Sequence, residues 1–100
     1  MDKEEALKLV EENGFELENL SGELKKDREV VLVAVQQNGN AIHFADEQYK
    51  KDKELVLIAI NSNWSSYQFA DDKLQNDKDV LNILESNEDY IKEKMLKKYI

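Results

Sequence analysis

The hydrophobic residues of this chain follow one pattern four times, with a period of 25 residues. Each copy begins directly after an aspartate, at Asp2, Asp27, Asp52 and Asp77. In the outer copies the apolar residues have helical spacing, as in "ALKLV" at 6–10 and "VLNIL" at 80–84, which predicts helices with one apolar face. The middle copies contain six consecutive apolar residues, "VVLVAV" at 30–35 and "LVLIAI" at 55–60, which predicts helices buried on every side.

A run of six apolar residues is also typical of a buried strand, and the Asn38-Gly39 pair that follows one of them is typical of a hairpin. Periodicity alone does not separate the two structures over so short a run. The outer copies have helical spacing, and equivalent units of a repeat protein share one structure. We therefore predict a helix in all four copies.

Residues that begin and end helices divide each copy into two parts. An aspartate before the apolar run is a preferred N-cap, because its carboxylate accepts hydrogen bonds from free backbone N–H groups. The first helix is expected to end at Asn13-Gly14, Asn38-Gly39 and Asn63-Trp64, with glycine in the left-handed conformation. In the third copy, Ser65 and Gln68 have the spacing of a capping box for the next helix.

A second helix is predicted after each stop, because apolar residues recur there at intervals of three and then four positions. These residues are Leu17, Leu20 and Leu24, then Ile42, Ala45 and Tyr49, then Tyr67, Ala70 and Leu74. The last second helix is expected to begin near Asp89 and to be longer. The predicted fold is all-α, a single domain over residues 1–100 with about eight short helices in four helix-turn-helix units. The units are 2–26, 27–51, 52–76 and 77–100, arranged as a small solenoid-like stack or a compact helical array.

The unit "DREVVLVAVQQNGNAIHFADEQYKK" resembles the tandem helical repeat catalogued as domain of unknown function four-one-one-six. That pattern has an acidic start, two valines, an alanine-valine pair, Asn-Gly and a short helix with an aromatic-alanine pair. The match is specific over 27–51 and 52–76 and weaker elsewhere, since Asn19-Leu20 replaces the aromatic-alanine pair in the first unit and the fourth unit lacks the Asn-Gly. In the third unit, Trp64 stands where a glycine is expected. The resemblance implies a helical repeat and assigns no activity.

Composition and charge limit the kinds of partner that the protein can bind and the cellular compartments that suit it. The formal net charge of −8 argues against a protein that follows a nucleic-acid backbone, because phosphate binding needs a cationic surface. The absence of cysteine excludes disulfides and thiolate sites and suits a reducing compartment. No signal peptide or membrane-spanning segment is visible, so we expect a cytoplasmic protein, although a longer or secreted precursor is compatible with the sequence.

Candidate chemistry is sparse, and we predict neither an enzyme nor a cofactor or metal site. His43 is the only histidine, and its equivalents Glu18, Gln68 and Glu93 are polar, which places it on a solvated face. The stretch "DDKLQNDKD" at 71–79 lacks the glycine and terminal glutamate of a calcium loop.

Three residues are candidates for binding a partner: Trp64, His43 and Gln68. Trp64 departs from its repeat, and a large aromatic residue at such a turn either fills the groove between units or anchors an interface. The basic C-terminal helix, which includes Tyr99 and Ile100, either closes the end of the array or lies on an anionic membrane; we favour closure.

The leading functional hypothesis is a non-catalytic module that binds another protein, because stacked helical repeats create extended surfaces. An acidic inhibitor or regulator of a basic protein is the alternative, supported by the first unit, which carries a formal charge of −4. A small enzyme that uses scattered carboxylates is a remote third class. We expect a monomer with an unknown protein partner, no nucleic acid and no membrane.

Overall fold

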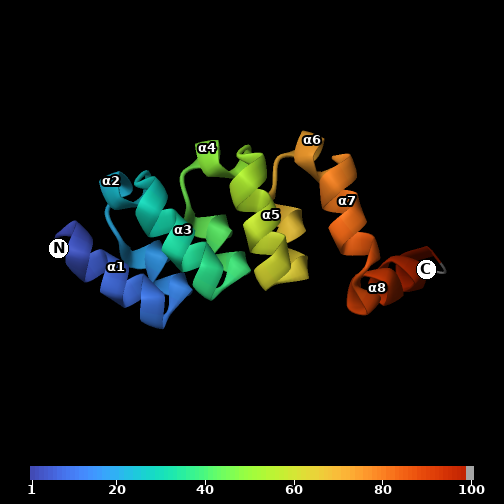
Figure 1. Ribbon diagram of the computed structural model, residues 1–100, viewed down its shortest axis with the longest axis horizontal. Helices are drawn as coiled ribbons and strands as arrows, with labels where there is room; N and C mark the ends of the chain where they lie inside the picture. The colour runs from blue at the N-terminus through green and yellow to red at the C-terminus, as the bar shows by residue number, and fades with distance from the viewer. Residues whose placement is uncertain (99–100) are drawn as a thin grey trace.

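The computed structural model describes residues 1–98 as a row of short helices and confirms the all-α class. The row measures 48 × 23 × 21 Å, and its radius of gyration of 14.2 Å exceeds the ~13 Å of a compact domain of this length. The shape is therefore an elongated stack (Figure 1).

The first three units share one architecture, with an α-helix of ten residues, a 3₁₀ helix and a single α-helical turn. These elements are α1 (Lys3–Glu12), η1 (Gly14–Asn19) and α2 (Gly22–Lys25); α3 (Arg28–Gln37), η2 (Gly39–Phe44) and α4 (Glu47–Lys50); and α5 (Lys53–Ser62), η3 (Trp64–Phe69) and α6 (Asp72–Gln75). The fourth unit contains α7 (Lys78–Glu85) and α8 (Glu88–Lys98). In the first three units the period of 25 residues therefore extends to the secondary structure.

The predicted capping aspartates are confirmed at all four first helices. For example, the carboxylate of Asp2 accepts a hydrogen bond of 2.9 Å from the N–H of Glu5, and that of Asp52 accepts one of 3.2 Å from the N–H of Leu55. Asp27 and Asp77 each accept from two backbone N–H groups. The sequence thus places each helix start correctly.

The prediction of one continuous second helix is wrong for the first three units, whereas in the fourth α8 begins at Glu88, next to the predicted start, and is continuous to Lys98. The backbone is extended at Leu20, Ala45 and Ala70, where each 3₁₀ helix ends. A new helical turn begins after a further cap, Ser21, Asp46 or Asp71, whose side-chain oxygen accepts a backbone hydrogen bond. Most of the predicted apolar stripe is nevertheless buried, because the bend keeps those side chains on the core side.

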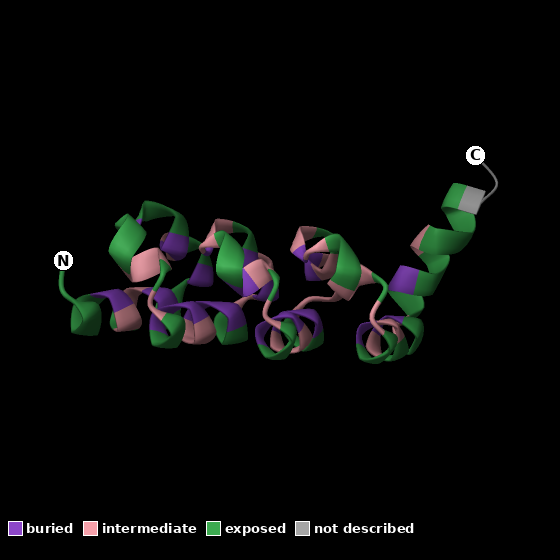
Figure 2. Ribbon diagram, turned by 90° about the horizontal axis from the view of Figure 1, so that it is seen from above, coloured by how far each residue is buried: buried purple, intermediate pink, exposed green. Residues whose placement is uncertain are grey.

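The core lies between two layers, which Figure 2 shows edge-on. The helices α1, α3, α5 and α7 form one layer, and the 3₁₀ helices pack against them from the other side. The predicted burial of the middle helices on every side is wrong. Val30, Val31, Ala34 and Val35 are buried, whereas the intervening Leu32 and Val33 remain partly exposed, as do Leu57 and Ile58 in the next unit. A stack of only two layers covers each first helix on its neighbour and inner sides and leaves its outer side open.

Glycine has a different role from the one predicted, since no glycine among the described residues has a positive φ. A Cβ added at Gly14 would lie 2.4 Å from the carbonyl oxygen of Ala34, and one at Gly39 would lie 2.0 Å from that of Ala59. Both distances are far inside van der Waals contact, so glycine permits the close approach of adjacent units.

A hydrogen bond accompanies each close approach. The N–H of Gly14 donates to Oε1 of Gln37 over 2.6 Å, and the N–H of Gly39 donates to Oγ of Ser62 over 3.0 Å. At the third joint, Trp64 replaces glycine, and the equivalent side chain, that of Asn87, instead accepts from the N–H of Tyr90 at the start of α8. The last joint is therefore built differently from the first two.

The predicted capping box in the third unit is also wrong. Asn63 precedes η3, and no side chain caps that helix. The hydroxyl of Ser65 instead donates to Oδ1 of Asn40 in the preceding unit over 3.3 Å. Ser65 therefore contributes a contact between units.

Candidate functional site

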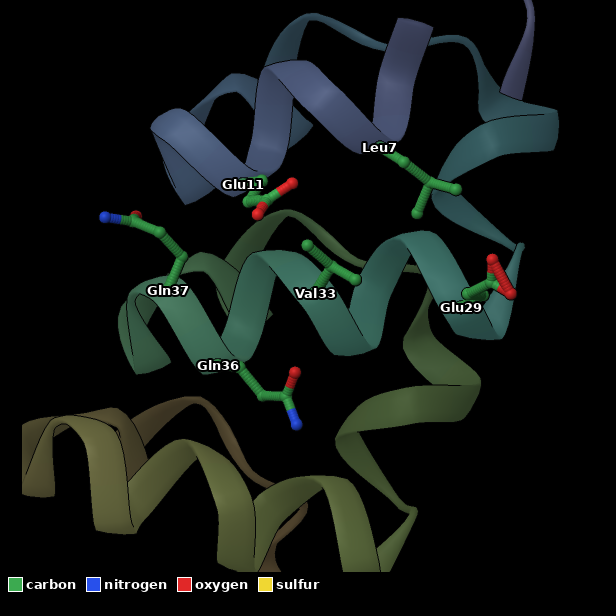
Figure 3. Close-up of a pocket in the computed structure, with 6 residues that line it drawn as sticks. All are labelled: Leu7, Glu11, Glu29, Val33, Gln36 and Gln37. Atoms are coloured by element: carbon green, nitrogen blue, oxygen red, sulfur yellow. The ribbon is translucent and has the colours of Figure 1, made fainter. Parts of the chain in front are cut away.

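A groove lies between α1 and α3. Its volume is ≈ 530 Å³, and all its lining residues come from these two helices. They are Leu7, Glu11, Glu29, Val33, Gln36 and Gln37 (Figure 3). The groove opens to solvent on the first-helix layer.

The centre of the groove is apolar because two hydrophobic side chains lie just outside the core. Leu7 follows the fully buried Ala6 on α1, and Val33 precedes the fully buried Ala34 on α3. Leu7 and Val33 pack against the core and are still partly exposed. They supply an apolar surface that a partner side chain would cover.

Carboxylates lie toward opposite ends of this apolar centre, Glu11 on α1 and Glu29 on α3 (Figure 3). Glu11 is exposed and has no cationic partner within 4.0 Å among the described side chains. Glu29 approaches Nζ of Lys3 only at 3.9 Å. Glu11 is thus unpaired within the described residues, and Glu29 has one long ion pair with Lys3; both carboxylates can still accept hydrogen bonds from a cation brought by a ligand.

One amide at the groove has a structural task. Oε1 of Gln37 holds the N–H of Gly14, so this side chain fixes the turn after α1 to α3. This hydrogen bond helps to set the spacing of α1 and α3 on either side of the groove. Neither a histidine nor a hydroxyl side chain lines it.

Next to the groove, a ladder of ion pairs joins each unit to the following one. Lys3 pairs with Asp27 at 3.2 Å, Arg28 pairs with Asp52, and Lys53 pairs with Asp77 at 3.2 Å. Each of these cationic residues comes directly after the capping aspartate of its own unit and pairs with the capping aspartate of the following unit. The ladder therefore also fixes the register of the stack.

The capping aspartates have lowered pKa values for reasons that the geometry explains. Partial desolvation raises the pKa of Asp52, but the Arg28 side chain and the N–H of Leu55 outweigh it and bring the pKa below its ordinary value. In Asp27 and Asp77, desolvation is likewise outweighed by backbone N–H groups and a lysine, so the pKa of each is lowered. These carboxylates are stabilised in the charged form.

The three candidates from the sequence lie elsewhere, on the 3₁₀ layer. His43 is exposed, and its ring contacts Phe69 with centroids 4.5 Å apart and Phe44 with centroids 5.0 Å apart. Gln68 is also exposed. His43 thus belongs to an aromatic row with Phe15, which meets Phe44 edge to face at 6.2 Å.

Trp64 belongs to a separate aromatic group at the third joint. It is partly buried, stacks on Tyr67 at 6.3 Å and meets Tyr90 edge to face at 6.0 Å. This position is that of a residue packed between units. Whether Trp64, His43 or Gln68 binds a partner stays a prediction.

Glu11 and Glu29 are not among the residues predicted from the sequence to bind a partner. Glu11 belongs to an acidic pair that is ordinarily a solvated helix face, and Glu29 is explained by the helix dipole. A signal existed in the period of 25 residues, because the equivalents of Glu11 are Gln36, Asn61 and Ser86. Glu11 is the only charged residue at this position of the repeat.

Residues 1–98 contain no helix of the length and apolarity needed to cross a membrane. In the same range, no group of three or more histidine, aspartate or glutamate side chains is arranged to hold a metal ion.

Comparison with known proteins identifies one family. The model of the family described as "Domain of unknown function (DUF4116)" matches residues 2–50 and 52–87. The two segments meet at the boundary between the second and third units. No curated protein and no solved structure matched the chain.

Proposed function

Because the chain belongs to the DUF4116 family, whose function is not described, we propose from the geometry of the molecule that it is a non-catalytic module that binds another protein through the α1–α3 groove. The observation that carries this proposal is a preformed groove with Leu7 and Val33 at its centre and Glu11 and Glu29 toward its ends. Binding sites of this kind combine apolar area with a few charged groups that set orientation.

The chemistry of the lining defines the class of partner. The segment that binds should carry a large apolar side chain with lysine or arginine nearby, because the carboxylates on the groove lining favour cations. A regulator of a basic protein is the second candidate, favoured by the formal charge of −4 on the first unit, which supplies α1. We place this activity in the cytoplasm, which the absence of cysteine supports.

Selection from a random peptide library on the immobilised full chain tests this proposal. The expected peptides contain a basic residue next to a large apolar one, and their binding weakens in high salt. Glu11→Lys should abolish the enrichment, whereas the matched control Glu12→Lys changes an exposed neighbour outside the groove lining and should retain it. Trp64→Ala tests the other surface in the same experiment. Enrichment that survives both Glu11→Lys and Leu7→Asp would overturn the proposal.

A further inference from the structure

The C-terminal helix α8 projects from the end of the row (Figure 2). It packs on the stack through Tyr90, which is buried, and beyond that residue its large apolar side chains face solvent. Ile91 is 39% exposed, Met95 54% and Leu96 66%. The sequence-based expectation that this helix closes the array thus describes only its first turn, and Tyr99 and Ile100 lie outside the described residues.

Helix geometry arranges charge around these apolar residues. Since successive side chains are about 100° apart, Ile91 and Met95 form one stripe, and Lys92 and Lys94 lie on its two sides. Both lysines are exposed. Nζ of Lys94 is also 5.8 Å from the centroid of the Tyr90 ring. The stripe of Ile91 and Met95 on α8 therefore lies between two cations, whereas Leu96, about 140° from Ile91 around the helix, lies outside it.

The α1–α3 groove has the complementary arrangement, with an apolar centre between two carboxylates. Helix length also agrees, because the 11 residues of α8 span ~16 Å and the 10 residues of α1 and of α3 span ~15 Å each. The groove lies at the N-terminal end of a row 48 Å long, and α8 lies at the other end (Figure 1). A helix at that distance does not reach the groove of its own chain.

We propose that α8 of a second copy of this chain occupies the α1–α3 groove, with Ile91 and Met95 on Leu7 and Val33, and lysines beside Glu11 and Glu29. The inference rests on the groove of the proposed function and names one occupant for it. The contact is heterologous, so each copy presents one free groove and one free helix, and copies join head to tail into short chains or a ring. One helix in one groove buries little area, so the association is weak and salt-sensitive. It replaces the expectation of a monomer.

Sedimentation velocity of the full chain over a range of concentrations tests the proposal. We expect the mean sedimentation coefficient to rise with concentration in low salt and to fall back in high salt. Glu11→Lys and Met95→Asp should each raise the dissociation constant by about tenfold or more, whereas Glu12→Lys should leave it unchanged. All three side chains are exposed, and circular dichroism would verify that each variant folds.

Mixing the two defective variants gives the decisive result. Glu11→Lys retains an intact α8, and Met95→Asp retains an intact groove, so together they should form a 1:1 heterodimer that does not grow further. A wild-type protein that stays monomeric at every concentration in low salt would overturn the inference, and so would a mixture that fails to pair. If the monomer instead floats with phosphatidylserine vesicles, the face of α8 is a membrane surface. If the protein is strictly monomeric and still selects peptides, the proposed function is supported and the proposal that α8 occupies the groove is overturned.

Discussion

Gly39 lies against Ala59 of the next unit so closely that no other residue type fits at its position. A Cβ there would be 2.0 Å from the Ala59 carbonyl oxygen and 2.8 Å from its carbonyl carbon, both of which are rigid backbone atoms. Gly14 has the same relationship to Ala34. The repeated Asn-Gly is thus a requirement of stacking, because the 3₁₀ helix of one unit begins in contact with the main helix of the following one.

Replacing this glycine should therefore separate two units. We expect Gly39→Ala to lower the free energy of unfolding by about 3 kcal/mol, since the backbone must move to admit a methyl group. Gly22→Ala is the matched control, because a Cβ at Gly22 meets nothing within 4 Å and should change stability little. Urea denaturation followed by circular dichroism measures both. Equal stabilities of the two variants would contradict the stacking argument.

Trp64, which stands where the other units have glycine, should hold the third joint together by different contacts. Trp64→Ala removes its packing against Tyr67 and Tyr90, and we expect a loss of about 2 kcal/mol because the side chain is partly exposed. Hydrogen exchange should accelerate in α8 before it does in α3. Trp64→Tyr, which keeps an aromatic ring, should retain most of the stability.

The fluorescence of Trp64 distinguishes packing from anchoring, since it is the only tryptophan. We expect emission shifted to the blue and shielded from acrylamide, because the indole is partly buried and packs against Tyr67 and Tyr90 at the joint. Red emission with free quenching in the isolated protein would favour an exposed anchor.

The sequence predicts the helix starts and the period well, because both depend on local chemistry. A carboxylate before an apolar run caps a helix whatever surrounds it, so Asp52 is assigned correctly. The groove on the outer side of the stack could not be predicted. The exposure of Val33 depends on the number of layers in the stack, and a run of six apolar residues gives no information about that number. The role of Gly39 in stacking could not be predicted either, because both a close approach to another backbone and a left-handed turn require glycine.

The break in the second helix had a local signal that the apolar stripe masked. Ser21, Asp46 and Asp71 occupy one position of the repeat, and all three residue types are preferred N-caps. The spacing of three and four positions survives across the bend, so periodicity alone suggested one helix. The equivalence of the three caps was the better evidence.

The hydroxyl of Ser66 is buried without a hydrogen-bond partner among the described residues, with 2% of the residue exposed. Its equivalent in the second unit is Ala41, which is fully buried. Ser66→Ala should therefore raise the free energy of unfolding by about 1 kcal/mol, because an unpaired hydroxyl is removed from the core. Ser65→Ala is the control and should lose a little stability, since Ser65 donates to Asn40. Urea denaturation measures both, and a destabilised Ser66→Ala would show that the hydroxyl has a partner in solution.

The ion-pair ladder should make the stability of the stack depend on acid. The pKa values of Asp27, Asp52 and Asp77 are lowered in the folded chain, so below the unfolded value of about 3.9 the unfolded state binds more protons. Their contribution is present in full above that value and is lost as the pH falls through the folded pKa values.

Asp52→Asn isolates the charge, because asparagine also caps a helix but does not attract Arg28. The variant should be less stable than the wild type at neutral pH and should approach it in acid. Urea denaturation between neutral pH and pH ~2 measures this, with the exposed Asp72→Asn as control; a stability difference independent of pH would assign the effect of Asp52 to capping alone.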